Sequence, residues 1–307
     1  MLLKFEEGNS KLKEGEFEIA KQTFSELLDD DPNHHDYITG YFISSYWDNR
    51  IEIILNQKEG KDRGSLLVKL FNEFLAEFQR RNFSKNETYE SLTFCILSEA
   101  SAQFRTSYQK DGLNGLNKEI LSNLVMCLTG IGDYRNAIEI IEYSKKYYTL
   151  SIQNLYYLAE CSFHVGEESK SRLYYRMAIV SDIEPLNLEI IKSEPILSTV
   201  FELKETLNDI DKVKYVLPVK LLERNLLPEV PEYTRDEISD LLEEISRLEK
   251  NLNTEREDLR FKVECRILTI SLSLLDSFSI QVNQELLKKI KNTILRIDPE
   301  LLDRRGR

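Results

Sequence analysis

The sequence predicts an all-α protein built as an array of helical hairpins. The first observation is a helix-turn-helix pattern that occurs twice in tandem, at 121–144 and 155–178. The turn glycines of the two copies, Gly132 and Gly166, are 34 residues apart. A fixed period of this length, with apolar residues at helical spacing, is typical of stacked hairpin repeats. The second observation is that glycine and proline are scarce, 11 and 7 in 307 residues, and no convincing apolar/polar alternation predicts a strand.

The first 34 residues match the same pattern. The matching positions are Phe5, Gly8, Gly15, Ala20, Phe24 and Pro32. Small residues at 8 and 20 let two helices approach closely, a glycine at 15 can adopt the positive φ that ends a helix, and a proline at 32 ends the next one. These three copies resemble the tetratricopeptide repeat (TPR) family. The resemblance implies a right-handed α-solenoid whose inner helices line a concave groove for a partner segment.

The resemblance also implies which side chains face the groove. These are Phe5, Asn9 and Leu12 in the first copy, Met126 in the second, and Tyr156, Glu160 and Phe163 in the third. The basic residues with which chaperone-binding members grip a C-terminal carboxylate are missing, so a co-chaperone role is not expected. Apolar anchors among polar neighbours favour an amphipathic or aromatic-bearing partner segment. The alternative is that these aromatic residues pack against a helical insertion at 64–108 that folds over the groove.

Between the repeats, residues 35–117 are predicted to form a degenerate hairpin with Trp47 in its core, followed by the insertion. The insertion is expected to hold helices at 64–82 and 87–108, and Asn86 or Ser84 can cap the second of them. The two tandem repeats then occupy 118–185, after a turn at 111–115.

The connector at 186–234 is expected to hold short helices near 186–193, 195–208 and 211–216. Three prolines, Pro218, Pro228 and Pro231, then predict a linker or domain boundary.

Residues 235–307 are predicted to form a helical hairpin and a capping helix. The seam of the first helix advances by three and four residues: Ile238, Leu241, Ile245, Leu248 and Leu252. A capping box at Thr254 and Glu257 begins the second helix, and Asn283 caps a last helix that ends at 298–299. This unit either covers the last apolar face of the solenoid or forms a dimer through 235–279. The arginines at 304, 305 and 307 are expected to be a frayed end.

Charge and composition limit the function classes. A net charge of −12 argues against nucleic acid as the main partner. Four separated cysteines in apolar contexts predict buried free thiols in a reducing compartment. No window is apolar enough to span a membrane and no secretory signal opens the chain, which favours the cytoplasm, although a chain trimmed of its signal peptide would look the same.

The chemistry of the chain predicts binding rather than catalysis. Three histidines, two of them adjacent, give no nucleophile with a partnered base, and no metal or cofactor motif is found. We therefore expect a non-enzymatic scaffold or adaptor that binds another protein. The alternatives are a structural assembly subunit that self-associates through the C-terminal helices, and a helical protein that binds a small apolar ligand.

Overall fold

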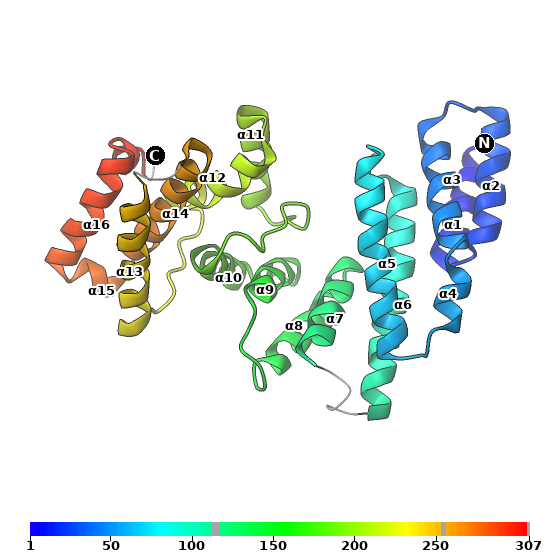
Figure 1. Cartoon of the computed structure of the whole chain (residues 1–307), viewed down its shortest axis with the longest axis horizontal. Helices are drawn as coiled ribbons and strands as arrows, with labels where there is room; N and C mark the ends of the chain where they lie inside the picture. Colours follow the sequence, from blue (N-terminus) through cyan, green and yellow to red (C-terminus); the bar gives the residue numbers. More distant parts are fainter. Residues whose placement is uncertain (112–116, 253–255, 306–307) are drawn as a thin grey trace. The chain divides into compact units, whose positions relative to one another are not determined.

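The computed structural model describes residues 1–111, 117–252 and 256–305, and these residues form helices and connecting turns with no strand among them (Figure 1). The all-α prediction is confirmed. The chain divides into two compact units, Met1–Thr149 and Leu150–Arg307. The division falls between the two tandem repeats, so each unit holds one of them, and each unit is described by itself.

The first unit is a succession of antiparallel hairpins. Its helices are α1 (Leu2–Glu14), α2 (Phe17–Asp30), α3 (His35–Asp48), α4 (Ile51–Asn56), α5 (Lys61–Arg80), α6 (Glu87–Asp111), α7 (Lys118–Gly130) and α8 (Tyr134–Ser144). Each of the pairs α1/α2, α2/α3, α5/α6 and α7/α8 packs side by side. The predicted turn at 111–115 falls mostly on residues 112–116, which lie outside the described ones.

The first hairpin forms as its small residues predict. Gly15 ends α1 with a φ of 80°, in the left-handed region. A Cβ atom at Gly8 would lie 2.9 Å from Cζ of Phe24, and one at Gly40 would lie 2.4 Å from its Cε1. The Phe24 ring, which is fully buried, therefore fills the space between α1 and α3 only because both positions lack a side chain.

The insertion packs onto the first repeats. Trp47 is fully buried, as predicted, with its ring 6.0 Å from that of Phe74 on α5. Helix α6 is capped by Asn86, whose Oδ1 accepts a hydrogen bond from the Tyr89 amide. The same side chain donates from Nδ2 to Oδ1 of Asp36 at 2.7 Å, and α6 packs against α1 and α3. The insertion thus covers part of the helix that the TPR resemblance assigns to the groove.

The second unit contains the remaining helices. Its helices are α9 (Ile152–His164), α10 (Glu168–Ser181), α11 (Ile196–Leu207), α12 (Ile210–Glu223), α13 (Arg235–Asn251), α14 (Glu257–Leu275), α15 (Phe278–Gln281), α16 (Gln284–Ile297) and α17 (Leu301–Arg304). The hairpin α9/α10 repeats the core positions of α7/α8. Ile141 and Tyr175, for example, are equivalent by the 34-residue period, and both are at most 1% exposed.

The connector is part of this core. Residues 183–193 form turns rather than the predicted helix, and Ile183 and Ile191 among them are buried. Helix α12 continues through Pro218 to Glu223, and Leu227 beyond it is fully buried. Pro218 therefore does not end the helix as predicted, whereas Pro228 and Pro231 lie in the non-helical connection between α12 and α13. The apolar residues around the prolines are held in the core, and this packing outweighs the local tendency of proline to end a helix.

The C-terminal seam also packs within the unit. Ile238 and Ile245 are buried, and Leu241, Leu248 and Leu252 are partly buried against the same core. Asn283 caps α16 as predicted, by accepting from the Leu286 amide. Helix α14 begins at Glu257, and Thr254 of the predicted capping box lies outside the described residues.

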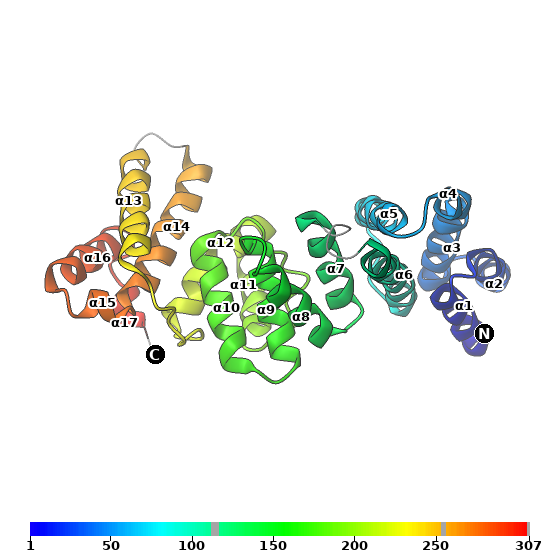
Figure 2. The ribbon, with the colours of Figure 1, turned by 90° about the horizontal axis from the view of Figure 1, so that it is seen from below.

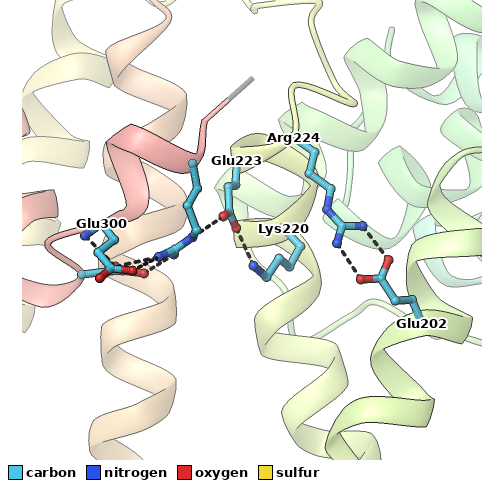
Figure 3. Close-up of polar contacts among 7 residues, drawn as sticks. Glu202, Lys220, Glu223, Arg224 and Glu300 are labelled. Carbon is cyan, nitrogen blue, oxygen red and sulfur yellow. Dashed lines mark hydrogen bonds and ion pairs between the residues drawn. The ribbon is translucent and has the colours of Figure 1, made fainter. Parts of the chain in front are cut away.

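The expectation of a frayed C-terminus is wrong for Arg304 and Arg305. Arg304 pairs with Glu223 at 2.8 Å and with Asp298 at 2.6 Å, and Arg305 pairs with Asp276. Figure 3 shows the contacts around Glu223, which also accepts from Lys220 of its own helix. Because Glu223 is only 4% exposed, its charge needs these cations, and they fasten α17 to α12. Arg307 lies outside the described residues.

Candidate binding pocket in the second unit

The structure distributes the predicted groove residues between surface and interior. Phe5, Met126 and Phe163 are half-buried. The others are interior residues: Asn9 and Leu12 in the first unit, and Tyr156 and Glu160 in the second, are at most 3% exposed. These residues belong to two compact units, Phe5, Asn9, Leu12 and Met126 to the first and Tyr156, Glu160 and Phe163 to the second.

Tyr156 and Glu160 are held by the segment that follows α10. The Tyr156 hydroxyl donates to the backbone carbonyl of Asp182 at 2.8 Å. The Glu160 carboxylate accepts from the Ser193 hydroxyl at 2.7 Å and the Lys192 amide at 3.0 Å. A partner cannot reach either side chain while residues 182–193 stay in place, so their assignment to an open groove is corrected: both stabilise the interior of the second unit.

A solvent-open pocket of about 380 Å³ lies elsewhere in the second unit, and its lining is mainly apolar. It is formed by the end of α10, the turn after it, and helices α12, α13 and α14. The lining residues are Ile179, Asp182, Ile183, Glu184, Tyr215, Pro218, Leu248, Leu259, Lys262, Val263, Cys265, Arg266 and Thr269.

Helix α14 supplies one wall because of its sequence spacing. Leu259, Lys262, Val263 and Arg266 advance by three, one and three residues, which places them on one face of a helix. In Figure 2, α13 lies beside α14, and Leu248 of α13 lines the same pocket. The wall thus alternates apolar side chains with two cationic ones.

The floor of the pocket is uncharged. Burial raises the pKa of the Cys265 thiol to about 12, so the sulfur stays protonated at neutral pH. The Thr269 hydroxyl donates to the Cys265 carbonyl at 2.8 Å, which satisfies the hydroxyl proton within the helix. A ligand group that enters this floor would therefore be apolar.

The rim carries charges that are held by hydrogen bonds. Arg266 binds Glu244 on α13 at 2.8 Å and donates to the carbonyls of Ile179 and Ser181 at 3.1 Å. These bonds fasten α14 to the end of α10 and to α13, and they fix the shape of the wall.

On the opposite side, the Tyr215 hydroxyl donates to the carboxylate of Glu184. This hydrogen bond is the largest of the causes that lower the pKa of Glu184, while burial and the same carboxylate raise the pKa of Tyr215. Lys214 donates to the backbone carbonyl of Glu184 at 2.6 Å. The turn at 182–184 is therefore fixed to α12, and Glu184 stays ionised.

This pocket was not predicted from the sequence. The hairpin that contains α13 and α14 was predicted, but not the segments from α10 and α12 that enclose the pocket with it. Tyr215 and Pro218 lie in the stretch that was predicted to lead into a linker. A signal was present in that stretch, because apolar residues continue past Pro218 at helical spacing.

Other classes of site are not formed by the described residues. Within residues 1–111, 117–252 and 256–305, no group of three or more His, Cys, Asp or Glu side chains is placed to hold a metal ion. Over the same residues, no helix has the length and apolar character needed to cross a membrane. Comparisons of the chain with family models, curated proteins and solved structures found no match.

Proposed function

We propose that the protein is a non-catalytic scaffold or adaptor, an α-solenoid of TPR-like hairpins that binds a segment of another protein. The single observation that carries this proposal is the open, mainly apolar pocket of about 380 Å³ in the second unit. Pockets of this kind, with an apolar floor and a few fixed polar groups, serve as sites for anchoring groups.

A protein segment suits the pocket because its mouth is open to solvent and bordered by ordered polar groups. Arg266 and the turn at 182–184 are fixed by several hydrogen bonds each, so the rim is formed before a partner arrives. A preformed rim lowers the entropic cost of binding. Apolar side chains that project from a backbone across the mouth could then enter the floor.

Site-specific photocrosslinking tests the proposal. A photoreactive phenylalanine replaces Leu259, which lines the pocket and is 39% exposed, and in a matched control it replaces Phe278, which is 78% exposed and does not line it. We expect adducts with a discrete cellular protein from position 259 and none of the same mass from position 278. The adduct should disappear when Val263→Arg fills the pocket. Absence of any adduct at 259 would contradict pocket-based binding.

A second candidate function, binding of a small apolar ligand, is favoured by the pocket volume. About 380 Å³ falls within the range of about 300–1,000 Å³ that is usual for small-molecule sites. Native mass spectrometry of the protein isolated from its source cell tests this candidate. If a bound small molecule is detected on the native protein and not on the Val263→Arg variant, the ligand of the pocket is a small molecule and not a protein segment.

Self-association through 235–279 has less support. The seam of α13 that would form a two-stranded interface already packs against the core of its own unit. A dimer through this seam would have to expose those residues first, at a cost in apolar burial.

A further inference from the structure

The charged groups around the pocket differ in whether they have a partner. Arg266 pairs with Glu244, and Lys214 pairs with Glu184 at 3.4 Å. The Asp182 carboxylate accepts a hydrogen bond from the Glu184 amide at 3.0 Å and so closes its own turn. These side chains are engaged in holding the walls together.

Lys262 is different. It lines the pocket on α14, and over the described part of the chain its ammonium group makes no ion pair or hydrogen bond with a carboxylate. Its Nζ lies 4.6 Å from the centroid of the Tyr215 ring. A cation over an aromatic ring is worth about 0.5–1 kcal/mol at an exposed site, and the arrangement leaves the ammonium free to accept an additional anion.

Glu264, the described carboxylate that follows Lys262 on its own helix, is already paired. Arg260 and Glu264 pair with each other at 2.9 Å. Across the pocket, Glu184 is within electrostatic range of Lys262, but its carboxylate is held by Tyr215 and its backbone carbonyl by Lys214. A ligand can therefore supply the carboxylate that the described residues do not.

We propose that the pocket binds an acidic amphipathic segment of a partner protein, with one large apolar side chain on the floor and an Asp or Glu carboxylate paired with Lys262. This inference rests on the proposed function and names the chemistry of the partner. Charge complementarity carries it: Lys262, which has no carboxylate partner within residues 1–111, 117–252 and 256–305, stands beside apolar Leu259 and Val263 on the same helix face. The partner segment should show the same adjacency of apolar and acidic residues.

A displayed library of random peptides tests the proposal, because it needs no assumption about which protein the partner is. Four proteins of all 307 residues serve as bait: the native chain, Lys262→Glu, Val263→Arg, and Lys291→Glu. Lys291, on α16, is a matched control because it is exposed, does not line the pocket and makes no ion pair within the described residues. Far-ultraviolet circular dichroism and urea midpoints verify that each bait is folded.

We expect the native chain and Lys291→Glu to enrich peptides with a large apolar residue next to Asp or Glu. Lys262→Glu should enrich Lys or Arg at the acidic position, and Val263→Arg should enrich none of these peptides. The leading peptide should bind Lys262→Gln about tenfold more weakly than the native chain. Replacing its acidic residue by the amide should cost the same factor on the native chain and almost none on Lys262→Gln.

The failures are distinguishable. If no peptide is enriched by the native chain, both the proposed function and this inference fail. If apolar peptides are enriched without an acidic preference, and Lys262→Glu selects the same ones, the proposed function stands and this inference is overturned. A third outcome is that no peptide is enriched, while dodecanoate binds the native chain but not Val263→Arg. The ligand carboxylate that pairs with Lys262 then belongs to a small amphiphile, and the proposal of a protein segment is overturned.

Discussion

Replacing Arg176 by alanine should destabilise the second unit by about 3–4 kcal/mol, in the range for loss of one partner of a buried ion pair. Arg176 lies on α10 and is fully buried. Its guanidinium donates to Oδ2 of Asp276 at 2.6 Å, to the Leu227 carbonyl at 2.7 Å, and to the hydroxyl and carbonyl of Ser273 at 3.1 and 3.2 Å. One side chain thus joins α10 to α14 and to the segment after α12.

The magnitude follows from what the substitution leaves behind. Removing one partner of a buried ion pair costs about 3–5 kcal/mol when the other charge stays in the interior, and here the remaining charge, on Asp276, is 19% exposed. Asp276 keeps Arg305 as a partner, which moves the expected cost toward the lower end. The carbonyls of Leu227 and Ser273 would lose the hydrogen bonds that Arg176 donates, which adds to the cost. Each unsatisfied buried acceptor costs about 1–3 kcal/mol where water cannot replace the donor.

The matched control is Arg172→Ala, one turn earlier on the same helix. Arg172 is 27% exposed and pairs with Glu229 and Glu168 at the surface. We expect this substitution to cost less than about 1 kcal/mol. Both substitutions replace arginine by alanine on one helix, so their difference reports burial.

Urea unfolding and amide hydrogen exchange measure the effect. The exchange rates of α14 and α10 report the second unit directly, even if the two units unfold in separate transitions. Arg176→Lys should fall between alanine and the native chain, because a lysine keeps the charge but cannot reach all of the same acceptors. If Arg176→Ala costs no more than Arg172→Ala, burial does not set the cost of losing the ion pair, and the reasoning is refuted.

Three further predictions concern other parts of the chain. Gly40→Ala should destabilise the first unit by about 1–3 kcal/mol in urea titrations, because its Cβ would lie 2.4 Å from the Phe24 ring. The pKa of Glu223 is lowered in the fold: burial alone raises it, but the lysine and arginine beside it outweigh that effect. Its contribution to stability should therefore be complete above its unfolded pKa of about 4.3 and be lost as pH falls through the lower folded value. Burial raises the pKa of Cys127 and Cys265 to about 12, so both thiols should resist a thiol reagent at about pH 8 until the chain is denatured.

Each of these has a control with a decisive outcome. An alanine in an unobstructed helix is more stable than glycine by about 1 kcal/mol, so a gain in stability for Gly40→Ala would refute the close packing. Combining it with Phe24→Leu should recover part of the loss. Glu223→Gln should remove the corresponding part of the pH dependence, and an unchanged profile would show that another carboxylate is responsible. Rapid labelling of either native thiol would contradict its burial.

Much of the fold could be predicted from local pattern. The spacing of apolar residues indicated the hairpins, and the turn positions indicated their ends, as at Gly15 and Asn283. These predictions succeed because helix periodicity and end-capping are properties of neighbouring residues. The connector failed for the opposite reason: Pro218 is a helix breaker locally, and only distant apolar partners keep α12 continuous.

The binding site was much less predictable. The TPR resemblance placed Tyr156 and Glu160 in a groove, but the chain that follows α10 buries both. The open pocket of the second unit combines segments that are far apart in the sequence, from Ile179 to Thr269. No spacing rule connects Tyr215 with Lys262, and their approach depends on how α12 and α14 pack.

The sequence by itself determined that this chain is helical, that two of its hairpins follow each other with a spacing of 34 residues, and that its net charge is −12, because these properties depend on residue identity and local spacing. Only the tertiary structure decided which polar groups are satisfied inside and which are left for a ligand. Arg176 and Lys262 are both cations on helices, yet one is held by several buried hydrogen bonds and the other stands without a carboxylate partner, among the described residues, at a pocket. That difference depends on which distant acceptors the packing brings within about 3 Å, the range of a hydrogen bond.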